Sequence, residues 1–459
     1  MNVPRSAPPN LSAVQHSLGE PLMPTFRWLA AKEFRELLSS RAYWLLLLMI
    51  APLVGHSFIT AVDTYAEASG IGGGPAALSQ GLSPLDGILV PTFGAYDLAA
   101  TLLFPFVAIR LVASERASGA AKLMQQSPAG APAMLAAKAV VLLVAWAIAW
   151  LPGLAGLLLW KLYGGALFPP EVLNLLCGHL LRVVVASGIS VAAGAMANSA
   201  ASAAIATLGF TVGAWALEFI AAGRGGLLQK LAGYTPNAAL RVFEQGEFRL
   251  STVLATFATG IVGFALAGIW LRAGRAWRVR TIATVAVIVA FALLLLGASR
   301  LRASWDLSEN RRNSFSAADE RTLTRIAQPL RITVYLSPED PRLADLDRNI
   351  LAKLQRALPQ VDILYAARSR AGLFEAPGDH YGEVWYEIGG RKGMTRSTTE
   401  PIVLDNLYQL AGLPSPTRDG SEFPGHPLRA TANGAAWIFY AVFPLARALA
   451  GWLHLRNRR

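Results

Sequence analysis

Ionisable side chains within long apolar runs are the residues of this sequence best placed to do chemistry. Asp97, Arg110, Arg182, Glu218 and Arg447 each lie in such a run. A charge in hydrocarbon is costly unless it pairs with another group or faces water, so these residues mark ion or substrate paths by default. Placement at the membrane interface is the alternative for Arg110, Asp97 and Glu218, because side chains near a helix end reach water.

We predict a candidate pathway from His179, Arg182 and Glu218. His179 and Arg182 lie deepest, where a structural hydrogen bond across a helix bundle is an equal alternative to transport. Prolines inside three apolar runs should kink those helices, which suits a transporter but also occurs in static bundles. These prolines are Pro52, Pro105 and Pro152.

The polar segment at 300–431 contains histidines near acidic residues, but their spacing matches no metal-ligand motif. Its candidates are His380, His426, Asp379, Glu375 and Glu383. Solvated loop residues are the favoured interpretation, and we predict no metal.

Motifs for nucleophilic or nucleotide chemistry are absent from the sequence. No GxSxG elbow occurs, and Ser316 is better placed as a helix N-cap, with Glu320 in the first turn. No GxxxxGK followed by Ser or Thr occurs either, so the chain has no P-loop for ATP. We therefore predict no catalytic residue and no cofactor bound by this chain, with any nucleotide energy supplied by a partner.

The composition is that of an integral membrane protein. Of 459 residues, 54% are hydrophobic and only 15% are charged, a balance that few soluble proteins keep. The net charge of +12 is first a topology signal in such a protein, and we expect no nucleic-acid partner. Cys177 is the single cysteine, which excludes an internal disulfide framework.

Eight apolar runs are long enough to span a bilayer as helices. They lie near 42–62, 93–113, 136–160, 172–196, 201–222, 251–271, 281–299 and 435–455. Lys and Arg gather before the first run, after the second, after the sixth and at the chain end, which places both termini in the cytoplasm and residues 300–431 outside. The loop at 223–250 is an exception to this rule, because it is basic although the topology places it outside. We expect a short helical piece within it. The predicted location is a bacterial inner membrane.

The chain divides into five parts by composition. We predict a disordered cytoplasmic tail at 1–23, a six-helix domain at 24–280, a seventh membrane helix at 281–299, an extracytoplasmic domain at 300–431, and an eighth helix with a basic end at 432–459. The six-helix domain begins with an amphipathic interfacial helix at 25–40. Its polar face is expected to carry Arg27, Lys32, Glu33, Arg35 and Glu36, opposite Phe26, Leu29, Ala30, Phe34, Leu37 and Leu38.

The extracytoplasmic segment has the pattern of a small α/β domain. Strands are predicted at 330–336 and 361–365, and a hairpin at 382–396 turns on Gly389-Gly390. Helices are predicted at 342–357 and 399–412. The order β-α-β-β-β-α indicates a thioredoxin-like domain or a relative, without any CxxC. A proline-rich linker at 414–427 leads back to the membrane.

The first six helices, with an elbow at 114–128 between the second and third, resemble an ABC-2 type transporter permease. The local match is Ser114-Glu115-Arg116-Ala117-Ser118-Gly119, similar to the acidic-x-x-x-Gly stretch before that family's coupling helix, although Ala120 replaces the usual Thr. The resemblance implies contact with a separate P-loop ATPase, and pairing of two copies as a homodimer or pseudo-dimer. The implied contact residues are Glu115, Gly119, Lys122, Gln125 and Gln126, helped by Lys32, Glu33 and Arg35.

The last third of the chain resembles the auxiliary subunit of gliding-motility-type ABC systems, in which a membrane helix leads into an external domain. The matching residues are 305–308, 312–316, the strand at 331–336, and 381–390 with 396–398. The external part is shorter than in many relatives. Together the two resemblances imply a permease fused to an auxiliary protein.

These resemblances imply the transmembrane subunit of an ABC transporter, an exporter by family analogy, with ATP on the partner subunit. The alternative is a non-transporting mechanical or scaffold protein that passes ATPase motion to an extracytoplasmic partner. A membrane-bound enzyme is disfavoured, because no catalytic constellation is present. Membrane lipid is the remaining expected partner.

Overall fold

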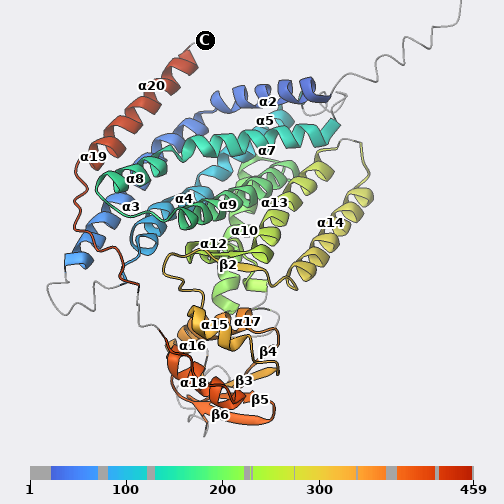
Figure 1. The fold of residues 1–459 in the computed structure, drawn as a ribbon. Helices are drawn as coiled ribbons and strands as arrows, with labels where there is room; N and C mark the ends of the chain where they lie inside the picture. Colours follow the sequence, from blue (N-terminus) through green and yellow to red (C-terminus); the bar gives the residue numbers. More distant parts are fainter. Residues whose placement is uncertain are drawn as a thin grey trace, which may run out of the picture.

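A bundle of long helices carries a small α/β domain at one end (Figure 1). The computed structural model describes residues 22–70, 81–120, 130–221, 228, 231–272, 274–337, 340–367, 380–418 and 423–456. Within these residues, 8 helical spans are long and apolar enough to cross a membrane. The protein is therefore a polytopic helical membrane protein, as its hydropathy predicts.

The spans are formed by the following elements. They are α3 (Arg41–Gly70), η4 (Leu85–Leu89) with α4 (Val90–Leu102) and α5 (Phe104–Ala117), α7 (Gly130–Ala149) with α8 (Leu151–Leu162), α9 (Pro169–Met196), α10 (Ala200–Ala221), α13 (Leu250–Leu271), α14 (Trp277–Ala298), and α19 (Ala435–Trp437) with η6 (Ile438–Val442) and α20 (Phe443–Arg456). The first four helical spans are longer than the apolar runs predicted from the sequence.

Two of the three predicted proline kinks are helix breaks. α4 ends before Pro105, which occupies the first turn of α5, and α7 ends before Pro152, which does the same in α8. Proline lacks a backbone N–H and is tolerated in the first turn of a helix, where that donor has no partner. Pro52 instead lies within the continuous helix α3.

Helix α9 lies at the centre of the bundle and α14 at its edge. In α9, 72% of the apolar window is buried, compared with 6% in α14. α9 crosses α13 at very short range, because a Cβ added to Gly188 would lie 2.1 Å from the carbonyl oxygen of Gly260. α14 packs chiefly against α13, with Trp270 Nε1 donating to Thr284 Oγ1 at 3.1 Å.

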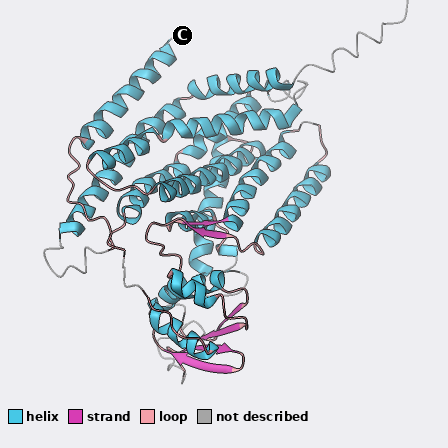
Figure 2. Cartoon of the chain, in the orientation of Figure 1, coloured by secondary structure: helices cyan, strands magenta, loops and turns pink. Residues whose placement is uncertain are grey.

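The domain contains a four-stranded sheet with helices on one face (Figure 2). Its strands are β3 (Leu330–Val334), β4 (Val361–Tyr365), β5 (Val384–Ile388) and β6 (Arg391–Thr395), and its helices are α15 (Ala317–Leu323), α16 (Pro341–Leu346), η5 (Asp347–Leu351), α17 (Ala352–Ala357) and α18 (Glu400–Ala411). The spatial order is β4-β3-β5-β6. β3 and β4 are parallel, whereas β3 with β5 and β5 with β6 are antiparallel.

Local sequence signals in this domain are confirmed. The hairpin turns at Gly389 and Gly390, with φ of 56° and 81°, which is the conformation that a two-residue turn of this type requires. Ser316 accepts the backbone N–H of Asp319 and so caps α15. The register places Ile332 opposite Tyr386, and both are fully buried against the helical layer.

A second, two-stranded sheet joins the domain to the bundle, and the sequence did not predict it. β1 (Glu247–Arg249) pairs antiparallel with β2 (Ser304–Asp306). β1 follows α12 (Pro236–Glu244), the short helix predicted within the loop at 223–250. Strands of three residues carry too little alternation to be recognised from sequence.

Candidate coupling site

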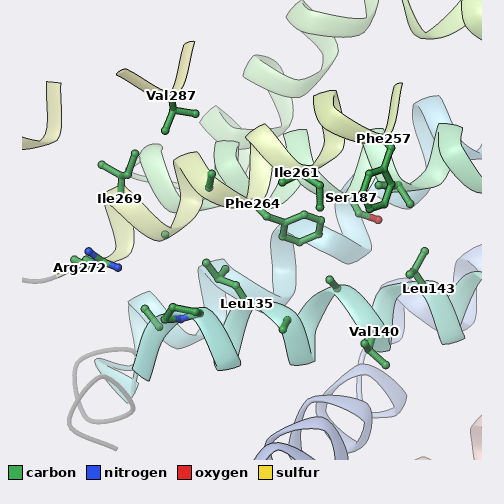
Figure 3. A pocket seen from close by; sticks show the side chains of 17 residues that line it. Leu135, Val140, Leu143, Ser187, Phe257, Ile261, Phe264, Ile269, Arg272 and Val287 are labelled. Carbon is green, nitrogen blue, oxygen red and sulfur yellow. The ribbon is translucent and has the colours of Figure 1, made fainter. Parts of the chain in front are cut away.

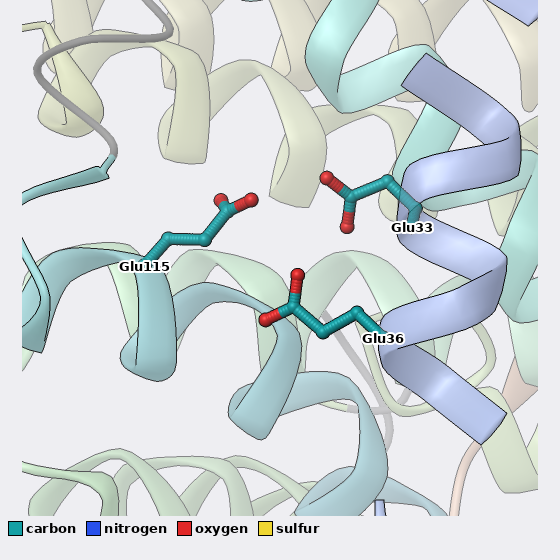
Figure 4. Close-up of side chains that lie close together, drawn as sticks. All are labelled: Glu33, Glu36 and Glu115. Atoms are coloured by element: carbon teal, nitrogen blue, oxygen red, sulfur yellow. The ribbon is translucent and has the colours of Figure 1, made fainter. Parts of the chain in front are cut away.

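An ion-pair network joins three helices at the end of the bundle opposite the domain, which we call the α2 end. α2 (Leu22–Leu38) contributes Lys32, Glu33 and Glu36, α5 contributes Glu115, and α7 contributes Lys138. The three carboxylates point toward one another from α2 and α5 (Figure 4). Their nearest oxygens lie within 4.8 Å of one another.

Lys138 is the centre of this network. Its ammonium group lies 2.7 Å from Glu33 Oε2 and 2.8 Å from Glu115 Oε2, and it donates to the carbonyl of Leu111 at 3.0 Å. Its side chain is fully buried. A buried ammonium group needs opposite charges and hydrogen-bond acceptors around it, and α2 and α5 supply both.

Lys32 completes the network on the side that faces solvent. It pairs with Glu33 at 3.1 Å, with Glu36 at 3.2 Å one helical turn away, and with Glu115. Since the two lysines pair with all three carboxylates, the arrangement is an ion-pair network rather than a ready-made cation site. It holds α2 against α5 and α7.

The charge states follow from burial and neighbours. Burial raises the pKa of Glu33, and the Glu115 carboxylate acts in the same direction, while Lys138 opposes the shift. Partial burial lowers the pKa of Lys32, but the hydrogen bond to Glu115 and the charge of Glu33 outweigh it, so the net shift is upward. Lys32 therefore stays charged at neutral pH.

The predicted polar face of α2 is wrong at Glu33. Glu33 is completely buried and faces the bundle, one turn before the buried Leu37. Lys138 supplies the opposite charge that a buried carboxylate needs. Glu115 is also buried. Both residues are thus linkers between helices, whereas Arg35 is exposed and Lys32 is partly exposed.

Arg116 ties the end of α5 to the end of α9. Its Nη1 donates to the carbonyls of Gly194 at 3.1 Å, Ala195 at 2.9 Å and Ala197 at 2.6 Å. A cation at the C-terminus of a helix satisfies unpaired carbonyls and interacts favourably with the helix dipole. These hydrogen bonds attach the start of the elbow at 114–128 directly to α9, the central helix.

The elbow continues through Gly119, whose φ is 74° with nothing within 4 Å of an added Cβ. This left-handed conformation ends the helical path of α5 at no steric cost to glycine. The predicted contact residues Lys122, Gln125 and Gln126 lie outside the described residues.

The predicted pathway residues form two separate clusters. Arg182 Nε lies 2.7 Å from Asp97 Oδ1, and its Nη2 donates to Thr101 at 2.9 Å. Glu218 instead pairs with Arg241 and accepts a hydrogen bond from Thr235. The sequence could not indicate this division, because the partners come from other helices.

A pocket of about 360 Å³ lies beside the Asp97–Arg182 pair, between α4, α9, α10 and α12. Thr101, Thr211 and Asn237 add polar atoms to its lining, and Glu218 does not line it. His179 is buried next to the pair, with its ring 5.5 Å from that of Phe93. Among the predicted pathway residues, Arg182 alone lines this pocket.

We expect Arg182→Met to destabilise the bundle by about 1–3 kcal/mol, because Asp97 and Thr101 lose their partner at membrane depth. The free energy of unfolding in mixed micelles would measure the effect. Arg110→Met, which removes an exposed arginine, is the control and should change it little. Equal stability of the two variants would contradict a role for the pair in holding α4 to α9.

The opposite end of α9 contacts the entry to the domain, and these residues were missed by sequence reasoning. Glu171 Oε1 accepts the backbone N–H of Glu309 at 2.6 Å. Asn174 Nδ2 donates to the carbonyl of Phe243 at 3.0 Å. Nearby, Arg312 pairs with Asp86 at 2.6 Å. The first turns of α9 are therefore fixed to the segment that leads into the domain.

The two histidines of the polar segment lie in loops, and each pairs with a glutamate. His380 Nδ1 lies 3.0 Å from Glu383 Oε2, and His426 Nε2 lies 3.0 Å from Glu309 Oε1. Arg396 also pairs with Glu383 at 3.0 Å, and these hydrogen bonds lower the pKa of that carboxyl. Asp379 and Glu375 lie outside the described residues.

Comparison with known proteins identified no relative: no family model, curated protein or solved structure matches the chain.

Proposed function

We propose that this chain is the transmembrane subunit of an ABC-type transport system, driven by a separate P-loop ATPase that binds at the α2 end. The observation that supports this most is the attachment of α9 at both of its ends. Arg116 holds its last turn to the elbow, and Glu171 in its first turn holds the entry to the domain.

Such an attachment suits the transmission of motion across the membrane. α9 has 28 residues and is about 42 Å long at the rise of an α-helix. Coupling between distant sites requires a physical element that both sites can bias. In this proposal α9, which is buried over most of its length, carries a displacement of the elbow to the domain.

In this proposal the ion-pair network makes the surface that the ATPase contacts rigid. Lys138 and Lys32 join α2, α5 and α7 through Glu33 and Glu115. In this proposal Lys32, Arg35 and Gly119 lie where the partner contacts the chain, and Glu33 and Glu115 pass its force inward. Two copies of the chain would form the pathway, with the pocket at Arg182 and Asp97 as part of it.

We further infer that the domain is thioredoxin-like. The sheet order β4-β3-β5-β6 with one parallel and two antiparallel pairings supports this assignment, as do the helices 341–357 and 400–411 on one face. It contains no cysteine, so its role is in binding or positioning rather than in thiol exchange.

A mechanical role without transport is the second candidate, and the tethering of the domain favours it. The β1–β2 sheet and the Arg356–Glu247 pair at 3.5 Å attach the domain to the bundle. Through these contacts, motion of the bundle would displace the domain and whatever partner it binds. Broad metabolite profiling of cells lacking the protein separates the candidates, because only a transporter causes a compound to accumulate or be depleted.

We expect Gly119→Leu to reduce copurification of a P-loop ATPase about tenfold. A side chain costs roughly 1–2 kcal/mol in the left-handed conformation, and a change of about 1.4 kcal/mol is tenfold in binding. Affinity purification of the tagged full-length protein from its native membranes, followed by quantitative mass spectrometry, would measure the effect.

Gly164→Leu is the matched control, since Gly164 has a φ of 92°, also has nothing within 4 Å of an added Cβ, and lies between α8 and α9 at the domain end. It should leave the ATPase bound. The proposal fails if wild-type protein brings down no P-loop ATPase, or if both variants lose it equally.

A further inference from the structure

An apolar groove of about 660 Å³ runs between α7, α9 and α13, with Val287 of α14 at its edge (Figure 3). Leu135 and Leu143 form one wall, and Phe257 and Phe264 lie on the other. Ser187 and Arg272 are the only polar side chains among its lining residues. No part of the proposed coupling mechanism uses this groove.

One mouth of the groove lies at Arg272, the first of four arginines that are close together in sequence. Arg272, Arg275, Arg278 and Arg280 lie within nine residues, and none of them forms an ion pair with a carboxylate among the described residues. Arg280 Nη2 donates to the Arg272 carbonyl at 3.0 Å. Arg272 lines the groove and Arg280 is hydrogen-bonded to its carbonyl, so this mouth can receive an anion.

Two tryptophans lie close to Arg280, whose side chain is hydrogen-bonded to the Arg272 carbonyl. The Arg280 guanidinium lies 5.9 Å from the centre of the Trp270 ring, and Trp270 meets Trp277 edge to face at 5.1 Å. Tryptophan and arginine gather at the headgroup level of membranes, where an amphipathic side chain is partly wet. The mouth therefore lies at the depth of lipid phosphates, and the groove extends from it into the hydrocarbon.

The length of the groove fits an acyl chain. From Phe257 to Arg272 the α13 wall spans about 22 Å, more than the roughly 15 Å depth of one leaflet. A single acyl chain can therefore lie along this wall over the whole depth of its leaflet.

We propose that the groove binds an anionic phospholipid, with one acyl chain along α7 and α13 and the headgroup phosphate at Arg272, assisted by Arg275 and Arg278. Basic pockets between membrane helices recognise anionic headgroups in this way. The bound chain also fills space where the six-helix unit meets α14, which packs chiefly against α13. It therefore contributes to the attachment of α14.

Native mass spectrometry of the full-length protein in a mild detergent tests the proposal, by titration with phosphatidylglycerol and with phosphatidylcholine of the same acyl chains. Wild-type protein should bind phosphatidylglycerol more tightly. The triple variant Arg272→Gln, Arg275→Gln, Arg278→Gln should weaken phosphatidylglycerol binding by about 100-fold, since each arginine near the surface contributes a factor of about five, and should leave phosphatidylcholine binding nearly unchanged.

The first control removes equal charge elsewhere at the α2 end. Arg27→Gln, Arg41→Gln, Arg456→Gln alters three exposed arginines outside the groove and should keep the lipid preference. The proposal is overturned if wild-type protein binds the two lipids equally, or if the two triple variants behave alike.

The second pair of variants tests the groove itself. Ala139→Leu with Ala265→Leu narrows it from both walls and should reduce binding of phosphatidylglycerol, whereas Ala286→Leu on the exposed face of α14 should not. Unchanged binding in the filled variant would contradict an acyl chain in the groove. Loss of a dimer in that variant, without loss of lipid, would assign the groove to a second copy instead.

Discussion

Replacing Lys138 with methionine should lower the free energy of unfolding by about 3–5 kcal/mol, which is the usual cost of removing one partner from a buried ion pair. Glu33 and Glu115 would remain buried at the junction of α2, α5 and α7 with no cation between them. Unfolding in mixed micelles, followed by circular dichroism, would measure the loss.

Two variants control for this result. Lys161→Met removes an exposed lysine of α8 and should cost little, because it frees no buried charge. Adding Glu33→Gln and Glu115→Gln to Lys138→Met removes the uncompensated charges and should restore much of the stability. If the triple variant is as unstable as Lys138→Met, packing of the lysine chain rather than its charge is responsible.

The second large effect is expected at the crossing of α9 and α13. Gly188→Ala should destabilise the protein by about 3 kcal/mol, at the upper end of overpacking effects. The added Cβ would lie 2.1 Å from the Gly260 carbonyl oxygen, and backbone cannot rotate away as a side chain can. Small residues permit such close approach of membrane helices, so the two helices would have to separate.

Gly209→Ala is the matched control for Gly188→Ala. Gly209 also lies within a membrane helix, but nothing lies within 4 Å of a Cβ added to it. Its replacement should leave the free energy of unfolding unchanged or raise it slightly, since alanine favours a helix. Similar losses in both variants would mean that glycine is needed for flexibility and not for the close crossing.

Signals within a few residues of one another were predictable from the sequence. The eight spans follow from runs of apolar residues, because insertion depends on the summed hydrophobicity of one segment. The hairpin at Gly389-Gly390 and the cap at Ser316 follow from the conformations that those residues allow. The arrangement of helices in the bundle was not predictable in this way.

The candidate site depended most on contacts between distant segments. Lys138 lies in the predicted span at 136–160, where nothing nearby in sequence indicates a charge partner. The sequence analysis placed Glu33 on the wrong face of α2, because amphipathic periodicity assigns charged residues to water. It takes no account of an opposite charge from another helix, here Lys138. Arg182 was singled out correctly as an ionisable residue at depth, but its partner Asp97 comes from another helix.

The sequence by itself determined that this protein crosses the membrane many times and carries a small α/β domain, since hydrophobic length and turn chemistry are properties of short segments. Only the tertiary structure decided that α9 joins the elbow to the domain, and that Arg272 lines an apolar groove. The physical reason is distance along the chain. Arg116 and Ala195 are 79 residues apart, and Glu171 and Glu309 are 138 apart, so only packing of the whole bundle brings them within hydrogen-bonding range.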